Sequence, residues 1–571
     1  MYNILTFYLV RRIIVLNKTK QNKFSKVENL STNEKMLHGT AWLSIGLLIS
    51  RIIGALYIIP WSRWIGEHYN VANGLYALAY APYILFLDIA TAGFPLAITK
   101  QISQLNARGE YKASMSLFKN SMLIMIGLGA FSCLTFYGLA DYIASISVVP
   151  TGNVNDSVLI LRSLAPAILI IPPISLLRGF FQGFQQMTTP ALSQILEQVV
   201  RVSYMLGATF YIMKIAKGSL VEAVSQSTFA AFIGAFVTLI FLLFELYKER
   251  YYIFEKIKLG KQTVSFSILD SFKLVLKDSI PFVVMSTGTS LLALIDNFSY
   301  NGIMNEFSTM TKDEIANSFA WFSANAAKLT NIVGSITMAI TASAIPNIAA
   351  LYHRKDKKQL SLAVTKDIEL LCFLVIPSAI GLFIVSNAIY AVFYGSIDGA
   401  HVLKIFCINL IITGFFSMFV SIIQSTGKHM IAIKSLSILL LSKLTFTLIL
   451  TAIFKENGPG LSSVVATILA TIYLFDELFK LTKFDTTYII KKTTNIIFAT
   501  LAMTAISLII YNILVILLPA NNNMANLFIV FITAIFGGLT YIYFTLKLNI
   551  MDSILPKQAL QFRRLLKKWN L

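Results

Sequence analysis

Seven charged side chains lie inside long apolar stretches of this sequence, and these residues are the candidates for chemistry. A charge within a membrane-spanning helix is costly and usually marks a substrate or ion pathway. Four of the seven are cations and three are acids, so at least one cation lacks an acidic partner. Because arginine and lysine bind phosphate oxygens well, this surplus predicts a cavity for an anion such as a phosphate or pyrophosphate. The candidates are Arg51, Asp88, Glu197, Arg201, Asp296, Lys328 and Lys443.

Several of these charges also have a structural interpretation. Glu197 and Arg201 are four residues apart on one predicted helix, so they could neutralise each other. Arg51 could pair with Asp88 on the adjacent predicted helix. Arg51 and Lys443 lie too deep in their apolar stretches to reach the membrane surface easily, which favours a functional role for both.

The elements that would position these charges are membrane-spanning helices. The 571 residues are 56% hydrophobic and 13% charged, whereas soluble proteins carry about 25% charged residues. Apolar stretches of about 20 residues, each long enough to cross the hydrocarbon layer as a helix, recur along the chain. The sequence therefore predicts an all-α polytopic membrane protein. Its fourteen predicted helices are centred near residues 50, 85, 130, 167, 201, 235, 288, 335, 376, 411, 441, 468, 505 and 534.

The basic residues are concentrated on one side of the predicted membrane. The formal net charge is +20, from 47 lysines and arginines against 27 acids. Most of the basic residues fall in the two ends of the chain and in every second loop. By the positive-inside rule, this pattern places both termini in the cytoplasm of a multi-pass plasma-membrane protein. It also argues against a nucleic-acid partner, because loops beside anionic headgroups account for the charge.

The sequence carries no residue pattern typical of an enzyme or a metal site. The three cysteines, Cys133, Cys372 and Cys407, fall in different predicted helices and show no metal-ligand spacing. The five histidines are scattered, and no phosphate-binding glycine-rich loop occurs. We therefore expect no catalytic residue, no cofactor, no bound metal and no ATP hydrolysis.

Two internal matches indicate a repeat of six helices. Pro95 follows the second predicted helix as Pro346 follows the eighth, and Gln182 and Gln424 occupy corresponding places further on. Two six-helix lobes in parallel orientation form a transporter whose substrate site lies near the membrane midplane between them. The predicted domains are a polar and basic cytoplasmic extension (1–37), an N-terminal lobe (38–246), a basic linker (247–274), a C-terminal lobe (275–480), two additional helices (494–546) and a basic cytoplasmic tail (547–571).

Three stretches of the sequence resemble a known family of exporters. They are EKMLHGTAWLSIGLLISRIIGALYIIPWSRWIG (34–66), ATAGFPLAITKQISQ (90–104) and RGFFQGFQQMTTPALSQILEQVVRV (178–202). They are similar to the MurJ/YtgP-type lipid II flippases, relatives of the SpoVB proteins in the polysaccharide-transporter branch of the MATE-like MOP exporter superfamily. The resemblance covers about residues 34 to 550.

The resemblance implies two MATE-like lobes with two extra C-terminal helices in a bacterial cell membrane. The implied function is to move lipid II, the undecaprenyl-pyrophosphate-linked peptidoglycan precursor, from the inner to the outer leaflet. Cationic residues of the central cavity are essential in such proteins, and Arg51 matches the arginine on their first helix. The extra helices are associated with a groove for the lipid tail. The implied partners are the lipid-linked glycan, membrane lipids and the cell-wall synthesis machinery.

Three other functions stay open on the sequence alone. The protein could flip another undecaprenyl-linked polysaccharide repeat unit, which would require similar cavity chemistry. It could be a MATE-type drug/cation antiporter, which predicts a dominant buried carboxylate and tolerance of Arg51 replacement. It could also be a scaffold for division or sporulation machinery, in which case loop residues rather than cavity residues would be essential.

Overall fold

The computed structural model of the chain describes residues 46, 49–147, 153–259, 267–519, 522–554 and 559–564. The predicted N-terminal extension lies outside these residues. The described part is built almost entirely from helices, and no β-strand occurs in it. This confirms the predicted all-α class.

The first lobe begins with a helix over residues 49–56, which continues after a turn at Tyr57. A helix also occupies part of the predicted linker and packs on the long third membrane helix. The elements of this part are α4 (Ile58–Ile65), η1 (Gly66–His68), α5 (Tyr69–Thr91), α6 (Phe94–Ala107), α7 (Tyr111–Ile146), α8 (Val154–Gly183), α9 (Thr188–Phe210), η2 (Tyr211–Ala216), α10 (Leu220–Lys248) and α11 (Arg250–Leu259).

The second lobe and the C-terminal helices follow in chain order. The second-lobe elements are α12 (Ile268–Phe307), α13 (Lys312–Ala320), η3 (Trp321–Ala326), α14 (Ala327–His353), α15 (Lys357–Ile384), α16 (Ser386–Tyr394), α17 (Ala400–Ser425), α18 (His429–Phe454), η4 (Lys455–Asn457) and α19 (Gly458–Thr482). The additional elements are α20 (Thr486–Leu517), α21 (Asn523–Lys547) and α22 (Ile550–Ile554).

The helices of the structure are compatible with the fourteen predicted membrane spans. Eleven helical stretches of the described residues are long and apolar enough to cross a membrane. Two of these stretches each include two of the predicted spans, because Ile49–Ala107 includes the first helix and α5, and His429–Thr482 includes α18 and α19. With α14 added, each of the fourteen predicted centres lies in a separate helix.

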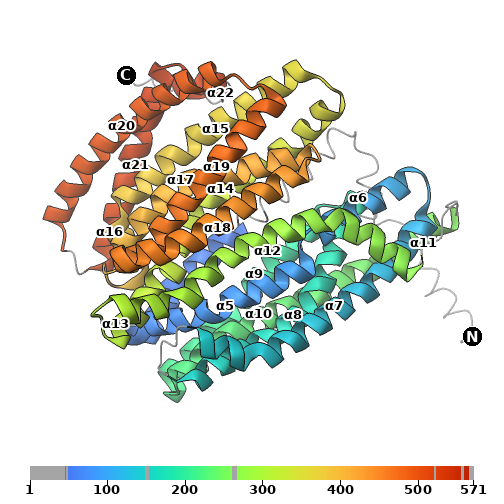
Figure 1. Cartoon of the computed structure of the whole chain (residues 1–571), viewed down its shortest axis with the longest axis horizontal. Coiled ribbons are helices and arrows are strands. Elements are labelled where there is room, and N and C mark those ends of the chain that lie inside the picture. The colour runs from blue at the N-terminus through green and yellow to red at the C-terminus, as the bar shows by residue number, and fades with distance from the viewer. Residues whose placement is uncertain are drawn as a thin grey trace, which may run out of the picture.

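The helices form two bundles that lie side by side (Figure 1). In the first bundle α8 packs against α5, α7 and α10, and in the second α17 packs against α14, α15 and α19. Helix α12 contacts α5 and α7 of the first bundle and α18 of the second, so it joins the two. Helices α20 and α21 pack on each other and on α15 and α16, at the side of the second bundle away from the first. These are the predicted two lobes with two additional helices.

Gly93 makes the sharp connection between α5 and α6 possible. Its backbone is left-handed, with φ of +75°, a conformation that only glycine adopts at little cost. A Cβ at this position would lie 2.8 Å from the Phe282 Cβ and 2.9 Å from the Ser279 carbonyl oxygen. The absent side chain therefore lets the end of α5 approach α12 closely, and this approach fixes one contact between the lobes.

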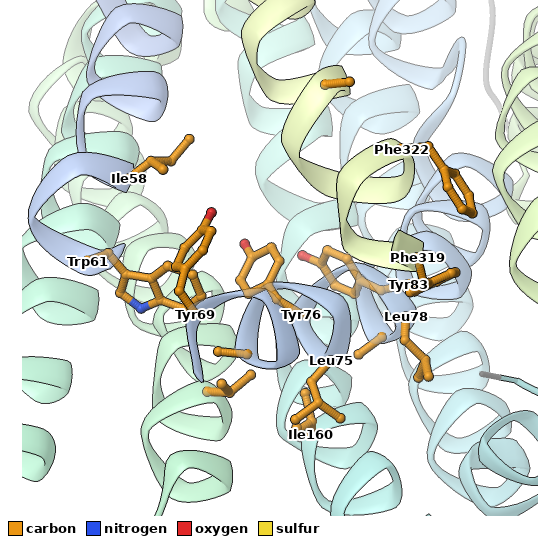
Figure 2. Packing of buried hydrophobic residues seen from close by; sticks show 14 of the residues in the cluster. Ile58, Trp61, Tyr69, Leu75, Tyr76, Leu78, Tyr83, Ile160, Phe319 and Phe322 are labelled. Carbon is orange, nitrogen blue, oxygen red and sulfur yellow. The ribbon is translucent and has the colours of Figure 1, made fainter. Parts of the chain in front are cut away.

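Helix α5 has two different faces, which orient it between the first lobe and the second. Leu75 lies on the side that packs against Ile160 of α8, within the largest apolar core (Figure 2). The rings of Tyr69, Tyr76 and Tyr83 project from the opposite side of the same helix (Figure 2). Two rings of this row face the second lobe, because Tyr69 bonds to Asn325 of η3 and Tyr76 lies against Lys328 of α14.

Candidate functional site

A cavity of about 620 Å³ lies between the two lobes. The first helix, α5 and α9 form its wall on the side of the first lobe, and η3 and α14 form the opposite wall. The described residues that line it include no aspartate and no glutamate. Its charged, polar and tyrosine residues are Ser50, Arg51, Tyr57, Tyr76, Tyr80, Gln198, Arg201, Ser323, Lys328 and Asn331.

Arg201 projects into the cavity from α9 and is held by tyrosine hydroxyls. One of its guanidinium nitrogens donates to the Tyr76 hydroxyl at 2.8 Å and to the Tyr80 hydroxyl at 3.3 Å. The guanidinium carbon also lies 5.4 Å from the centre of the Tyr80 ring. These partners are neutral, so they orient the arginine without cancelling its charge.

Lys328 enters the cavity from the start of α14, directly after the π-helical turn η3. Such turns push side chains out of the regular helical register and are frequent at functional sites. The Lys328 ammonium donates to the Asn73 Oδ1 of α5 at 2.6 Å and lies 5.0 Å from the centre of the Tyr76 ring. It forms no ion pair with an acid among the described residues. Neutral oxygens and aromatic faces therefore stabilise this charge as well.

Arg51, on the first helix, is the third cation of the cavity. Its guanidinium contacts the sulfur of Met338 on α14, and it forms no ion pair within the described part of the chain. Met338 lies ten residues beyond Lys328 on α14, a distance of about 15 Å along a helix axis. The cavity cations are therefore spread along the cavity rather than gathered at one point.

Glu197 is neutralised by a residue that the sequence did not single out. Its carboxylate forms an ion pair with Arg178 of α8 at 2.7 Å, and Arg178 also donates to the Ser193 hydroxyl at 2.8 Å. The suggested pairing of Glu197 with Arg201 is therefore wrong. Their spacing of four residues places them on one face of α9, but α8 supplies a closer cation for Glu197, and Arg201 turns toward α5.

The other three predicted residues also lie outside the cavity lining. Asp88 of α5 accepts a hydrogen bond from the Ser290 hydroxyl of α12, so the suggested Arg51–Asp88 pair does not form. Asp296 of α12 forms an ion pair with Lys443 of α18 at 2.7 Å within the second lobe. The structure therefore brings three of the seven predicted residues together in the cavity. A substrate-binding role for the other four stays a prediction.

Sequence reasoning missed the tyrosines of the cavity. Of those on α5, Tyr76 and Tyr80 are four residues apart, which places them on one face of a helix. That spacing was visible, but an aromatic row on a membrane helix is also typical of packing. Asn73, which holds Lys328, was also missed, because only charged residues were considered as candidates on this helix.

A network of hydrogen bonds joins the lobes beyond Lys328, and its centre is the fully buried Asn325 of η3. The Asn325 Oδ1 accepts from Tyr69 at 3.4 Å and from the side-chain amide of Asn73, both on α5. Its own amide donates to the Tyr390 hydroxyl at 2.7 Å, and the Tyr394 hydroxyl donates to its backbone carbonyl at 2.8 Å. This network holds α5 against the second lobe at that end of the cavity.

A second hollow, of about 430 Å³, lies between the additional helices and the second lobe. Its lining is mainly apolar and comes from α15, α16, α20 and α21. Phe373, Pro377 and Leu382 are among its residues on the side of the second lobe, and Met503 and Tyr541 are among those on the additional helices. An apolar groove of this kind can accept a hydrocarbon chain but not a charged group.

Comparisons with known proteins support the architecture. The chain is 29% identical, over 93% of its length and 99% of the relative, to the lipid II flippase MurJ of Bacillus subtilis (strain 168). It is 26% identical to the stage V sporulation protein B of the same organism, over 65% of this chain and 69% of that protein. The resemblance to MurJ-type flippases is thereby confirmed.

Solved structures show the same fold. The lipid II flippase MurJ in an inward closed conformation matches with a TM-score of 0.62 at 17% identity, over 88% of this chain and 97% of that one. An inward-facing multidrug resistance MATE family transporter of the MOP superfamily matches with a TM-score of 0.59 at 14% identity, over 75% and 95% of the two chains. Residues 36–352 match the family described as polysaccharide biosynthesis protein. The chain is thus a multi-pass membrane protein with a MATE-like fold, and it belongs to the polysaccharide biosynthesis protein family.

Proposed function

We propose that this protein is a flippase that moves lipid II from the inner to the outer leaflet of a bacterial cell membrane. The pyrophosphate of the substrate binds in the cavity between the lobes, and the lobes rock to expose that cavity to each side in turn. The observation that carries the proposal is the lining, in which Arg51, Arg201 and Lys328 face the cavity and no described acid does. The likeness to MurJ supports the choice of substrate.

The cationic lining addresses the main physical obstacle to flipping. A pyrophosphate loses its hydration when it enters a membrane, and an unpaired charge in hydrocarbon is very costly. Each charge-assisted hydrogen bond to a phosphate oxygen returns about 1.5–3 kcal/mol. Because Arg51 and Lys328 lie at different depths of the cavity, the anion can keep a cationic partner as it advances.

The hydrogen bonds around Asn325 suit the closed end of an alternating-access cycle. With the predicted cytoplasmic termini, α5 begins at the outer side of the membrane, so Tyr69 and Asn325 would lie at the outer end of the cavity. The cavity would then receive its substrate from the cytoplasmic side. Rupture of this polar network, which is small compared with the apolar cores of the lobes, would open the outer side.

The apolar hollow between the second lobe and α20–α21 suits the prenyl tail of the same substrate. Its lining is mainly apolar, and the part of α20 and α21 that faces away from it is strongly exposed, as expected for a lipid-facing surface. The tail would remain in apolar surroundings while the head group crosses in the cavity. This division of the substrate between two environments explains why the chain has helices beyond the two lobes.

We further propose that the membrane potential drives transport. An outward-moving anion gains about 2.3 kcal/mol per charge for every 100 mV of inside-negative potential. The charged pyrophosphate of lipid II belongs to the head group that crosses the membrane, so the membrane potential acts on the charge that is transported. Flipping in proteoliposomes should accelerate when a potential of this sign is imposed, and rates indifferent to the potential would contradict this part of the proposal.

The second candidate is a flippase for another undecaprenyl-linked glycan. The family description as polysaccharide biosynthesis protein favours it, and the same cationic cavity would bind the same pyrophosphate. A drug/cation antiporter fits less well, because it requires a buried carboxylate in the cavity and the described lining has none.

The test is complementation in a bacterial host depleted of its essential lipid II flippase. The wild type, Arg51→Ala and Arg162→Ala are expressed at matched membrane levels. Arg162 pairs with Asp141 on the exposed surface of the first lobe, so its replacement controls for the loss of an arginine. We expect wild type and Arg162→Ala to restore growth and outer-leaflet lipid II, and Arg51→Ala to fail.

Each result has a definite meaning. If Arg51→Ala also rescues, the protein flips lipid II but the anion-binding role of Arg51 is wrong. If well-expressed wild type fails, lipid II is not the substrate, and the assay is repeated with a host that lacks the flippase of another undecaprenyl-linked glycan.

A further inference from the structure

Lys443 of α18 is fully buried inside the second lobe, away from the cavity, and four oxygen atoms surround its ammonium group. The Asp296 Oδ1 of α12 lies 2.7 Å from the nitrogen. On α19, the Pro459 carbonyl oxygen lies at 2.9 Å, the Ser462 hydroxyl at 2.8 Å and the Ser463 hydroxyl at 2.9 Å. We call these four oxygens the oxygen cage.

The cage offers more oxygens than an ammonium group can use. An ammonium has three N–H donors, and the three oxygens from α19 each accept a hydrogen bond from it. The carboxylate of Asp296 is a fourth oxygen at contact distance. The three N–H bonds of an ammonium group point in fixed directions and cannot each meet one of four oxygens, whereas a metal cation has no directional donors and can contact all four.

The three cage oxygens of α19 are held in place by bonds that do not involve the lysine. The hydroxyls of Ser462 and Ser463 both donate to the Pro459 carbonyl oxygen, at 2.9 and 3.0 Å, within the first turns of α19. The Ser462 hydroxyl also shares a hydrogen bond of 3.0 Å with Thr447. The α19 side of the site is therefore preorganised, and removal of the lysine side chain would leave these three oxygens in a similar arrangement.

The charge balance requires a cation in the cage. The side chain of Asp296 is only 14% exposed, and a buried carboxylate without a partner is strongly destabilising. We propose that the oxygen cage is a monovalent-cation site whose permanent occupant is the ammonium of Lys443. The oxygen distances of 2.7–2.9 Å suit an ammonium or potassium ion better than the smaller sodium ion.

The position of the cage connects it with transport, and this consequence rests on the proposed flippase function. Asp296 lies on α12, six residues beyond Ser290, which bonds to Asp88 of the first lobe. If a free ion bound and left at this place, its binding would be coupled to the movement of α12 between the lobes. Because the cation here is covalently tethered, the oxygen cage stays neutral throughout the cycle, and this site takes no ion from either side of the membrane.

The experiment measures cation binding by the purified full-length protein and needs no substrate. Thermal unfolding of the wild type, Lys443→Ala and the double variant Asp296→Asn/Lys443→Ala is recorded in ammonium, potassium, sodium and choline chloride at equal ionic strength. We expect the wild-type midpoint to be the same in all four salts. For Lys443→Ala, ammonium and potassium should raise the midpoint over choline by roughly 2 °C or more, in a saturable way, and sodium should raise it less.

The double variant is the matched control, because it lacks both the tethered cation and the carboxylate that demands one. Its midpoint should show no preference among the salts. The proposal is overturned if Lys443→Ala is equally stable in all four salts or is unfolded in all of them while the double variant folds. It is also overturned if the wild type responds to potassium or sodium and Asp296→Asn abolishes that response.

A second measurement decides the question if neither alanine variant folds. Saturable binding of rubidium, a potassium analogue, is then measured on the wild type and on Asp296→Asn. Rubidium binding that requires Asp296 would show that the site takes a free ion, and it would overturn the proposal that Lys443 occupies the cage permanently. The absence of such binding supports the proposal. None of these results depends on whether lipid II is the substrate, so a failure here is distinguishable from a failure of the proposed function.

Discussion

Lys328→Met removes a cavity charge while it preserves the length and most of the volume of the side chain. The ammonium of Lys328 bonds to Asn73 at 2.6 Å and faces the ring of Tyr76, and no described acid pairs with it. In the substrate complex it would form a charge-assisted hydrogen bond to a phosphate oxygen. Loss of such a bond costs about 1.5–3 kcal/mol, which corresponds to roughly 10- to 150-fold weaker binding.

The same substitution should change protein stability much less. The bond to Asn73 and the interaction with the tyrosine ring are lost, and the latter is worth about 0.5–2 kcal/mol. The variant also no longer buries an ammonium group, and this saving offsets the loss. We therefore expect a thermal midpoint close to that of the wild type, so that any loss of binding reflects the missing charge rather than unfolding.

The assay is equilibrium binding of labelled lipid II to the protein in nanodiscs, followed by flipping in proteoliposomes. Lys328→Arg keeps the charge and should retain most of the affinity, and Arg162→Met controls for removal of a cation outside the cavity. The reasoning is refuted if Lys328→Met binds within about threefold of the wild type. It is also refuted if Lys328→Arg loses as much affinity as Lys328→Met, because shape rather than charge would then decide.

Three further predictions follow from single contacts. Arg178→Met leaves the carboxylate of Glu197 without its partner and should lower stability by about 1–3 kcal/mol in a denaturation experiment; addition of Glu197→Gln should recover at least half of the loss. Gly93→Ala forces a left-handed alanine against α12 and should cost about 1–3 kcal/mol, whereas Gly138→Ala, inside α7 with open space around it, should cost nothing or stabilise by up to about 1 kcal/mol. Tyr76→Phe removes an acceptor from the cavity arginine on α9 and should weaken lipid II binding about 2- to 10-fold, and an unchanged affinity would mean that the hydroxyl does not position that arginine.

The class of protein and the positions of its helices could be predicted from the sequence. A helix must cross about 30 Å of hydrocarbon, so each span appears as an apolar run of about 20 residues. The surplus of cations among the deep charges was equally visible, because charges are rare enough in such runs to be counted. Arg51 could be identified as a cavity residue both from its depth and from the motif around it.

The pairing of the buried charges was decided only by the tertiary structure. Glu197 meets Arg178 rather than Arg201, and Lys443 meets Asp296 from a helix far along the chain. In a soluble helix the apolar stripe shows which face turns inward, but a membrane helix is apolar on all sides because lipid is as apolar as the protein core. The sequence therefore determined which charges enter the membrane, and only the rotation and packing of the helices decided which of them face the cavity and which neutralise each other.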